Sequence, residues 1–249
     1  MTSLLTELTI GDAFGNAVTR AWRDRPVVAG VGHETLERDD GLLVVNDLSV
    51  YFAPFDRWGV PDRVAAERAT GRVLDVGCGP GRHALHLQDR GLDVLGIEPS
   101  AGAAAVARER GVDVRELAVQ DVDSTLGSFD TILLGGQNIG LLESRVKGPD
   151  LLTRLAAVTA PGGKLLGVAT DPYSLRSPWH RAYLDRNRER GRLPGQQRFR
   201  LRHGVVATSW FDYLTLSVPE LEDLAGPTPW RLTDVVRSGH QYLAHFVLE

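Results

Sequence analysis

A glycine-rich turn in the stretch VLDVGCGPGRHAL, residues 73–85, carries the residue types that most clearly indicate chemistry. Gly77, Gly79 and Gly81 follow a short apolar run, and residues without a side chain let a ligand approach the backbone closely. A nucleoside-triphosphate loop would place a lysine directly after its last glycine, but Arg82 follows Gly81. Arg82 also stands where a dinucleotide fingerprint requires its third glycine. The turn therefore predicts a ligand that needs backbone contact rather than a lysine cradle for phosphates.

Two acidic residues follow the turn, near the ends of later apolar runs. Glu98 lies in GIEPS and precedes Pro99, while Asp121 lies in VQDV and precedes Val122. One carboxylate can accept hydrogen bonds from both hydroxyls of a ribose. Glu98 is thus placed like the acidic residue of other doubly wound nucleotide sites.

The pattern DVGCGPG, with these acidic residues and with FDTILLGG and PGGKLLG further on, resembles the class I S-adenosylmethionine-dependent methyltransferases. The likeness is to the small-molecule, type 11-like members, and it covers about residues 70–170 well and the rest loosely. It implies an α/β fold with a doubly wound, Rossmann-like sheet of seven strands, the last one antiparallel, and an N-terminal helix and hairpin cap. It also implies S-adenosylmethionine as the cofactor, which carries an ammonium, a carboxylate and a sulfonium but no phosphate.

The resemblance also implies which residues contact the cofactor. Asp75 would fix the loop or reach the amino group of the cofactor through a water. Asp121 would contact the adenine amino group, with Val122 beside the ring. The expected cofactor-binding residues are Tyr51, Asp75, Gly77, Cys78, Gly79, Gly81, Glu98, Pro99, Asp121, Val122, Gly135 and Gln137.

Tyr51, in NDLSVYFAPFDRW, resembles the aromatic residue that many of these enzymes bring over the cofactor from an N-terminal segment. A sulfonium over a ring face gains cation–π attraction. Packing of an N-terminal arm is the alternative role for Tyr51 and its aromatic neighbours.

The residues GGQN at 135–138 follow the expected fourth strand, where this fold places the transferable methyl group and the acceptor. Some families carry D/N-P-P-Y/F there, which marks methylation of planar amino groups. Its absence argues against methylation of DNA adenine or of glutamine. For Gln137 and Asn138, a loop amide that caps the next helix is the alternative.

Three residues are candidates for taking a proton from the acceptor: His33, His180 and Tyr183. Methyl transfer is an in-line displacement in which positioning supplies most of the acceleration, so a strong base is not required. His83 and His86 lie three residues apart on an expected helix, but no third ligand is evident, and we expect no metal site.

Residues 176–203 hold nine arginines and only two acidic residues, Asp185 and Glu189. The spacing of Trp179, Tyr183 and Arg186 predicts an amphipathic helix with these side chains on one face. Such a charge run is usually a solvated face. Because the segment follows the expected fifth strand, binding of an anionic acceptor is the functional alternative.

Short apolar runs alternate with helical segments from residue 71 onward, which is typical of a parallel sheet covered by helices. The predicted core strands are 72–76, 93–97, 113–117, 129–134 and 164–169, and the predicted core helices are 82–90, 101–110 and 149–159, the last stopped by Pro161-Gly162-Gly163. Before them we expect a helix at 12–23, a hairpin that turns at Asp40-Gly41, and a helix at 60–69. After them we expect strands at 197–203 and 205–213, a helix at 218–224, and strands at 231–237 and 242–248. We therefore predict an N-terminal cap or lid over residues 1–60 and a methyltransferase core over 61–249, with a β-rich insertion near 172–213.

The composition narrows the class of protein. The 249 residues carry a formal net charge of −4, which gives no global sign of nucleic-acid binding. Cys78 is the single cysteine, so no intramolecular disulfide is expected. The first residues lack a basic leader pattern and no apolar run has membrane-spanning length, so a cytoplasmic protein without a membrane partner is expected.

The sequence as a whole predicts methyl transfer from S-adenosylmethionine to an oxygen or nitrogen of a small molecule, with an anionic acceptor as one option. A non-methylating enzyme or binding module of the same fold is one alternative. An RNA methyltransferase that uses the arginine-rich segment is the other.

Overall fold

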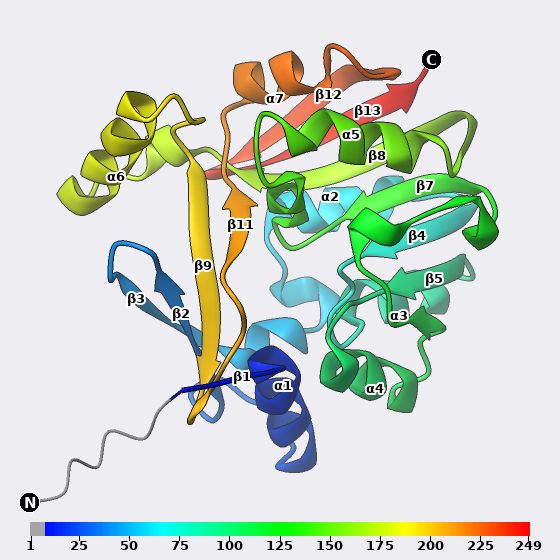
Figure 1. Ribbon diagram of the computed structural model, residues 1–249. Coiled ribbons are helices and arrows are strands. Elements are labelled where there is room, and N and C mark those ends of the chain that lie inside the picture. Colours follow the sequence, from blue (N-terminus) through cyan, green and yellow to red (C-terminus); the bar gives the residue numbers. More distant parts are fainter. Residues whose placement is uncertain (1–7) are drawn as a thin grey trace, which may run out of the picture.

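The computed structural model describes residues 8–249, which form two β-sheets and the helices that pack on them (Figure 1). The larger sheet has seven strands. In spatial order they are β12 (Trp230–Ser238), β13 (Gln241–Leu248), β8 (Thr159–Thr170), β7 (Phe129–Leu134), β4 (Arg72–Val76), β5 (Asp93–Ile97) and β6 (Val114–Arg115). The strands from β8 to β6 run parallel, whereas the last strand, β13, is antiparallel to both of its neighbours. This order confirms the predicted seven-stranded, doubly wound sheet.

The central strand β4 sets the position of the functional site. Residues 73–76 are buried, as expected for a parallel strand covered on both faces. From β4 the chain builds the sheet first toward β5 and β6 and then, on the other side, toward β7 and β8. The strand order therefore reverses at β4, and in open α/β sheets ligands bind outside the carboxyl ends of the strands at this point.

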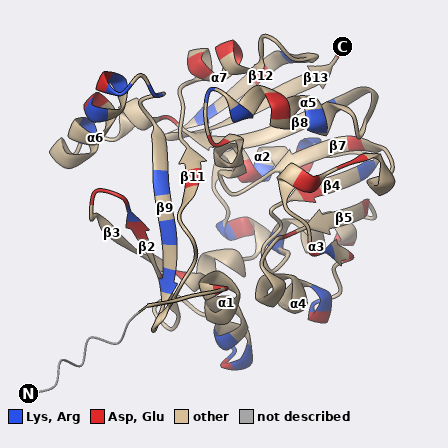
Figure 2. Ribbon diagram, in the orientation of Figure 1, with Lys and Arg blue, Asp and Glu red and all other residues tan. Residues whose placement is uncertain are grey.

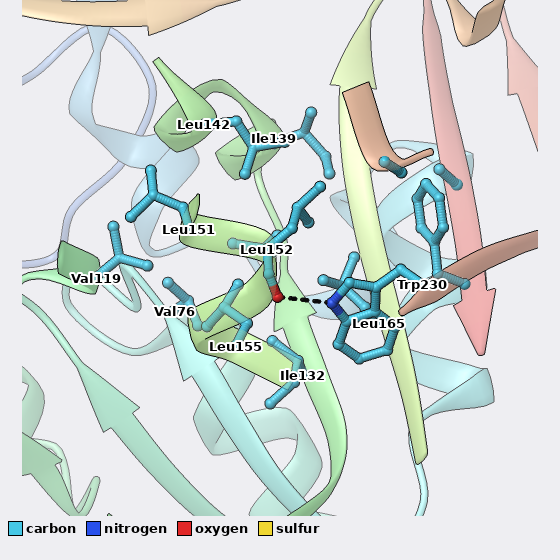
Figure 3. Packing of buried hydrophobic residues seen from close by; sticks show 14 of the residues in the cluster. Val76, Val119, Ile132, Ile139, Leu142, Leu151, Leu152, Leu155, Leu165 and Trp230 are labelled. Atoms are coloured by element: carbon cyan, nitrogen blue, oxygen red, sulfur yellow. Dashed lines mark hydrogen bonds between the residues drawn. The ribbon is translucent and has the colours of Figure 1, made fainter. Parts of the chain in front are cut away.

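Helices cover the two faces of the large sheet. Its helices are α2 (Val60–Arg68), α3 (Arg82–Asp89), α4 (Ala101–Glu109), α5 (Lys147–Ala156) and α7 (Val218–Ala225). One apolar cluster joins α2, α3 and α4 to the sheet, and a second joins α5 and α7 to its opposite face. In the second cluster, leucines of α5 pack against strand residues such as Ile132, and Trp230 Nε1 donates to the carbonyl of Leu152 at 2.8 Å (Figure 3).

The second sheet, called the small sheet below, joins segments from both ends of the chain. Its strands are β1 (Thr9–Ile10), β2 (His33–Arg38), β3 (Leu43–Asp47), β9 (Gln196–His203), β10 (Val206–Ala207) and β11 (Phe211–Leu214). The turn of the β2–β3 hairpin lies at Asp40-Gly41 as predicted, and Gly41 has φ of +88°. Strand β2 is also paired with β9, so the hairpin is joined to the sheet through β2, and β3 is the edge strand. Two helices pack on this region: α1 (Ala13–Arg23) and α6 (Pro178–Glu189).

Short 3-10 helices make most of the remaining connections. They are η1 (Leu48–Tyr51), η2 (Phe55–Arg57), η3 (Val119–Asp121), η4 (Ser124–Leu126), η5 (Asn138–Leu142) and η6 (Pro172–Ser174). Within residues 8–249, the structure has no helix with the length and apolar character needed to cross a bilayer.

Four predicted elements differ from the structure. The helix predicted over 149–159 ends at Ala156, because Thr159 already pairs with Phe129 of β7. The next pair joins Thr131 to Lys164, so the Pro-Gly-Gly segment is an irregularity inside β8 instead of a break before it. The strand predicted over 113–117 shortens to two residues at the sheet edge, and the strand predicted over 205–213 divides into β10 and β11.

Candidate active site

The glycine loop, residues 77–81, leads from β4 into α3. Gly77, Gly79 and Gly81 have φ of +69°, +55° and +85°, the left-handed region that glycine adopts without strain. The N–H of Gly77 donates to the carbonyl of Ile97 at 2.8 Å, which ties the loop to β5. A methyl group on Gly77 would lie 2.7 Å from Asn138 Nδ2. Both the backbone conformation and this close approach therefore require glycine at position 77.

Glu98 follows β5 and touches the glycine loop directly. Its side chain is buried, and its two oxygens accept hydrogen bonds from the backbone N–H groups of Gly79 and Ser100, each at 2.9 Å. Burial raises the pKa of Glu98 to about 7, and the two hydrogen bonds oppose that rise. Each carboxylate oxygen has a second lone pair, so Glu98 can still accept hydrogen bonds from a ligand.

Asp75, near the end of β4, is a second buried carboxyl group at the loop. Its side chain is 1% exposed, and neither oxygen has a hydrogen-bond partner within residues 8–249. Burial raises the pKa of Asp75, while the charges of His83 and Arg82 oppose the rise. Because buried polar atoms are normally hydrogen-bonded, the position favours a ligand or water that donates hydrogen bonds.

Helix α1 is fixed beside this site by Asp12. The Asp12 carboxylate caps α1 by accepting from the N–H of Gly15 at 2.8 Å. It also accepts from Ser100 Oγ at 2.9 Å and from the N–H of Gly102 at 3.0 Å. A methyl group on Gly102 would lie 2.6 Å from the Cα of Gly15, so two glycines let α1 and α4 approach closely. One carboxylate thus holds the N-terminal helix next to the residues that follow Glu98.

Tyr51 of η1 lies beside the glycine loop. Its ring meets Phe14 of α1 edge to face, with centroids 5.2 Å apart, and Phe14 lies 3.9 Å from the place of a methyl group on Gly79. The Tyr51 hydroxyl donates to Glu34 Oε1 at 2.6 Å. Burial, and then the charge of Glu34, raise the pKa of Tyr51 well above its ordinary value, which keeps the phenol protonated. Arg82 of α3 donates to a backbone carbonyl of η1 at 2.9 Å and fixes this segment to the core.

Asp62 of α2 binds the loop after β7. Asp62 Oδ1 accepts from the N–H of Gly136 at 2.7 Å and lies 3.1 Å from His83 Nε2. Burial raises the pKa of Asp62, but the hydrogen bond and charge of His83, with the charge of Arg82 and the N–H of Gly136, together outweigh it and hold the pKa below its ordinary value. A methyl group on Gly135 would lie 2.7 Å from the His83 ring, so this glycine is needed for the packing.

Tyr213 of β11 holds the same loop from the small sheet. Its hydroxyl donates to the carbonyl of Gln137 at 2.8 Å, and its ring fills the space over Gly140, where a methyl group would overlap it. Gln137 has φ of +76°, an unfavourable conformation for a residue with a side chain. Asn138 Nδ2 donates to the carbonyls of residues 76 and 77 at 2.8 and 2.9 Å. The loop after β7 is therefore tied both to the glycine loop and to the small sheet.

Comparison with known proteins agrees with this arrangement. Residues 73–163 match the family model described as a methyltransferase domain. This segment is a class I S-adenosylmethionine-dependent methyltransferase domain.

Relatives and solved structures are similar over different parts of the chain. A tRNA U34 carboxymethyltransferase of Trichlorobacter lovleyi is 33% identical over 103 residues, which are 38% of this chain and 31% of the relative. A ubiquinone biosynthesis O-methyltransferase of Dechloromonas aromatica is 33% identical over 101 residues, which are 38% of this chain and 42% of the relative. The chain thus aligns with less than half the length of these relatives.

One solved structure is similar over nearly the whole chain. It is a SAM-dependent methyltransferase from Bacteroides fragilis in complex with S-adenosyl-L-homocysteine. The TM-score is 0.80, the identity 22%, and the match covers 99% of each chain. The small sheet and the methyltransferase domain therefore form a fold that another protein shares.

Most residues predicted to bind the cofactor lie together around two loops of the methyltransferase domain, the glycine loop and the loop after β7. These are Tyr51, Asp75, Gly77, Gly79, Glu98, Gly135 and Gln137. Asp121, at the end of η3, and Pro99, after Glu98, are exposed. Contact between any of these residues and the cofactor remains a prediction.

Three other predicted cofactor residues have packing roles in the methyltransferase domain. Val122 is fully buried in the apolar core. The buried Cys78 thiol lies against β5, where a methyl group on Gly96 would be 2.7 Å from the sulfur. Gly81 begins α3, and a methyl group there would lie 2.6 Å from Val112.

The histidines proposed as bases lie elsewhere. His33 is exposed, and because side chains alternate along a strand it points to the face of β2 opposite Glu34. His180 is buried in α6, with Nε2 3.2 Å from the carbonyl of Pro172. Neither contacts the two loops of the methyltransferase domain, so the geometry does not favour either as a base.

Tyr183 joins α6 to the hairpin instead of lining the site. Its hydroxyl donates to Asp39 at 2.7 Å, and the Arg38 guanidinium lies 3.9 Å from its ring centroid. The α-helix places Trp179 and Tyr183 on one side, as predicted, but Trp179 is 61% exposed whereas Tyr183 is 2% exposed, so that side is buried only in part. The helix buries the face of His180, Tyr183, Leu184 and Asn187, which follows a slightly different helical stripe.

The two histidines that suggested a metal have other partners. His83 lies against Asp62, and His86 stacks on Phe55 with ring centroids 4.2 Å apart. In the described part of the chain, no three His, Cys, Asp or Glu side chains are grouped as a metal site would require.

The arginines of β9 lie on the face of the small sheet that points away from Tyr213. Residues 198, 200 and 202 alternate with the residues that pair with Tyr213 and Phe211. Arg200 donates to both oxygens of Glu37 at 2.8 and 3.0 Å, and Arg202 donates to the same group at 3.2 Å. Figure 2 shows these blue segments along β9. The prediction that this segment could bind an anionic acceptor at the site is not supported by this orientation.

Four residues of the site were not identified from the sequence: Asp12, Glu34, Asp62 and Tyr213. Asp12 stands at the start of a predicted helix, which is a recognisable capping signal. The other three carry no local signal, because their partners are 17 to 76 residues away in the sequence.

Proposed function

We propose that the protein transfers a methyl group from S-adenosylmethionine to a small-molecule acceptor. The observation that carries this proposal is the pair of buried carboxyl groups, Asp75 and Glu98, at a glycine loop that has no lysine. No group among the described residues donates a hydrogen bond to Asp75. The cofactor carries an ammonium group that could do so. The residues present therefore fit this cofactor better than a phosphate-bearing nucleotide.

The cofactor, when bound, supplies a methyl group that its sulfonium makes electrophilic. The residues of this chain would hold it in place. Glu98 would accept from the ribose hydroxyls, and Asp75 would attract the ammonium group directly or through a water. Gly77 and Gly79 would leave the loop backbone open to contact. Asp121 would accept from the adenine amino group.

The acceptor would lie between the loop after β7 and the small sheet. Tyr51 and Tyr213 reach this region from two different segments, and both are fixed by hydrogen bonds. Because the reaction depends mainly on placing the acceptor, rigid walls suit it. Both tyrosines belong to the part of the chain outside the matched domain, so this part would select the acceptor.

Transfer to RNA is the second candidate, because several curated relatives of the domain are named tRNA U34 carboxymethyltransferases. The arginine-rich segment gives it limited support. Four of its nine arginines, Arg186, Arg188, Arg200 and Arg202, are paired with acidic residues of the protein. Paired arginines release fewer counterions on binding a phosphate backbone.

Calorimetric titration tests the cofactor. We expect the protein to bind S-adenosylmethionine and S-adenosylhomocysteine, and to bind NAD⁺ and ATP at least about tenfold more weakly, because a lysine cradle is absent. Tighter binding of either phosphate compound would contradict the proposal. Incubation with S-adenosylmethionine and candidate acceptors, followed by mass spectrometry, then separates methyl transfer from mere binding.

Titration with generic RNA at about 50 and 200 mM salt tests the acceptor class. We expect weak binding with little dependence on salt. Micromolar affinity with a steep logarithmic salt slope would favour the RNA candidate instead.

A further inference from the structure

Glu34 on β2 is a buried carboxyl group that the predicted mechanism does not use. Its side chain is 2% exposed, and its Oε2 has no hydrogen-bond partner within residues 8–249. Burial raises the pKa of Glu34, while hydrogen bonds from Tyr51 and Asn46 oppose the rise. An unpaired buried acceptor is unfavourable, so a ligand that donates a hydrogen bond to Oε2 would gain from doing so.

The two donors on Glu34 both use its other oxygen. Tyr51 donates to Oε1 at 2.6 Å, and Asn46 of β3 donates to the same atom at 3.3 Å. They fix the orientation of the carboxyl group and leave the buried Oε2 without a hydrogen-bond partner. Glu34 is therefore held in position by the protein rather than free to turn toward solvent.

Glu34 lies on the face of the small sheet that meets the loop after β7. The strand register places Glu34 and Arg38 on the same face of β2, and Arg38 pairs with Phe199. Phe199 lies on the same face as Phe211 and Tyr213, with ring centroids 6.5 and 6.4 Å away. This inner face, defined by these residues, contacts the loop after β7 through Tyr213.

Charge is divided between the two faces of the small sheet. The opposite, outer face carries Glu37 paired with Arg200 and Arg202, together with the exposed Arg198. On the inner face, Arg38 is already paired with Asp40 at 2.8 Å. The carboxyl group of Glu34, in contrast, has no cationic partner among the described residues. The inner face thus suits a ligand that donates a hydrogen bond and not an anion.

We infer that Glu34 recognises the acceptor, and that the acceptor presents an amine or a hydroxyl group to Glu34 Oε2. This inference rests on the proposed function and narrows it to acceptors that donate hydrogen bonds. The aromatic side chains of the inner face would hold the apolar part of the same molecule. Tyr51 acts through Glu34 as a positioning residue.

Three probes of similar shape test the inference: phenethylamine, phenethyl alcohol and 3-phenylpropionate. Their binding to the protein saturated with S-adenosylhomocysteine is followed by saturation-transfer NMR. The variants are Glu34→Gln and, as a matched control on the outer face of the same strand, Glu37→Gln. In Glu34→Gln, Tyr51 and Asn46 keep the amide oxygen as their acceptor, so the NH₂ group takes the place of Oε2.

We expect wild type to bind the amine, the alcohol or both more tightly than the carboxylate. Glu34→Gln should weaken binding of the amine by about tenfold or more, because one donor then faces another. The alcohol should lose less affinity, since its oxygen can accept a hydrogen bond from the new NH₂ group. This difference in affinity loss distinguishes amine acceptors from hydroxyl acceptors. Glu37→Gln should match wild type for every probe.

Three results would overturn the inference: the carboxylate binding best, none of the probes binding, or Glu34→Gln binding the amine as wild type does. Calorimetry with S-adenosylhomocysteine is run on each protein in parallel. If wild type fails to bind it, the proposed function itself fails. A loss of its affinity only in Glu34→Gln would place Glu34 at the cofactor and also overturn the inference.

Discussion

Replacement of Glu98 by glutamine should change stability and cofactor binding in opposite directions. The buried carboxyl group accepts from the backbone N–H groups of Gly79 and Ser100, and its pKa is raised from 4.5 to about 7, mainly by burial. Glutamine has nearly the same shape but no charge. It therefore removes the burial cost of the carboxylate, and it leaves one oxygen where the carboxylate offered two.

The magnitude follows from the pKa. Between pH of about 4.5 and 7 the unfolded chain has lost the Glu98 proton while the folded protein keeps it, so the free energy of unfolding falls as pH rises. At about 1.4 kcal/mol per pKa unit, the total fall is about 3 kcal/mol. Glu98→Gln lacks this fall, so its stability relative to wild type should rise by up to about 3 kcal/mol between pH of about 4.5 and 7. Its NH₂ group faces one of the two backbone N–H donors, so near pH 4.5 it should be less stable than wild type by about 1 kcal/mol.

Binding should respond in the other direction. A carboxylate that accepts from two ribose hydroxyls is replaced by an amide with one acceptor, and we expect S-adenosylhomocysteine to bind about tenfold more weakly at pH 8. Wild-type binding should itself strengthen as pH rises through 7, since the ionised carboxylate is the better acceptor.

Urea unfolding followed by tryptophan fluorescence, from about pH 5 to pH 8, measures the stability difference. Calorimetry over the same range measures binding. Glu116→Gln is the control, because this residue is exposed after the neighbouring strand β6. Parallel stability curves for wild type and Glu98→Gln, or unchanged affinity at pH 8, would refute the reasoning about Glu98.

Three further predictions concern the loops and the small sheet. Gly77→Ala places a methyl group 2.7 Å from Asn138 at φ of +69°, whereas Gly162→Ala has φ of +71° and nothing within 4 Å. Both should lose about 1 kcal/mol on thermal unfolding because of the positive φ, but only Gly77→Ala should also lose S-adenosylhomocysteine binding. Equal affinity of the two variants for S-adenosylhomocysteine would remove the close approach as a cause. Tyr213→Phe removes the hydrogen bond to the Gln137 carbonyl. It should lower the free energy of unfolding by about 1 kcal/mol in urea titrations and leave cofactor affinity unchanged. A large loss of cofactor affinity would show that Tyr213 contacts the cofactor. Arg198→Glu, on the outer face, should leave binding of S-adenosylhomocysteine and phenethylamine unchanged by calorimetry and NMR, and a tenfold change in either would mean that the outer face takes part in binding.

The sequence alone predicted the elements whose signals are local. The strands around β4 and β5 were found because buried parallel strands read as continuous apolar runs, and the helix ends because glycine follows them. The Asp40-Gly41 hairpin and the glycine loop follow from the backbone freedom of the residues in them. The methyltransferase domain and the carboxylate of Glu98 are also recognisable from the sequence. The glycine loop and Glu98 follow successive strands, so they occur in a fixed order along the chain.

Only the tertiary structure decided how the two ends of the chain meet. Strand β2 pairs with β9, about 160 residues later, and no local pattern in either strand specifies this partner or its register. Because side chains alternate along a strand, the register fixes which face each residue occupies. It turned Arg200 and Arg202 outward to Glu37, and it turned Glu34 inward to Tyr51. The sequence therefore determined the glycine loop, while long-range strand pairing determined which charged side chains of the small sheet share the face of Tyr213.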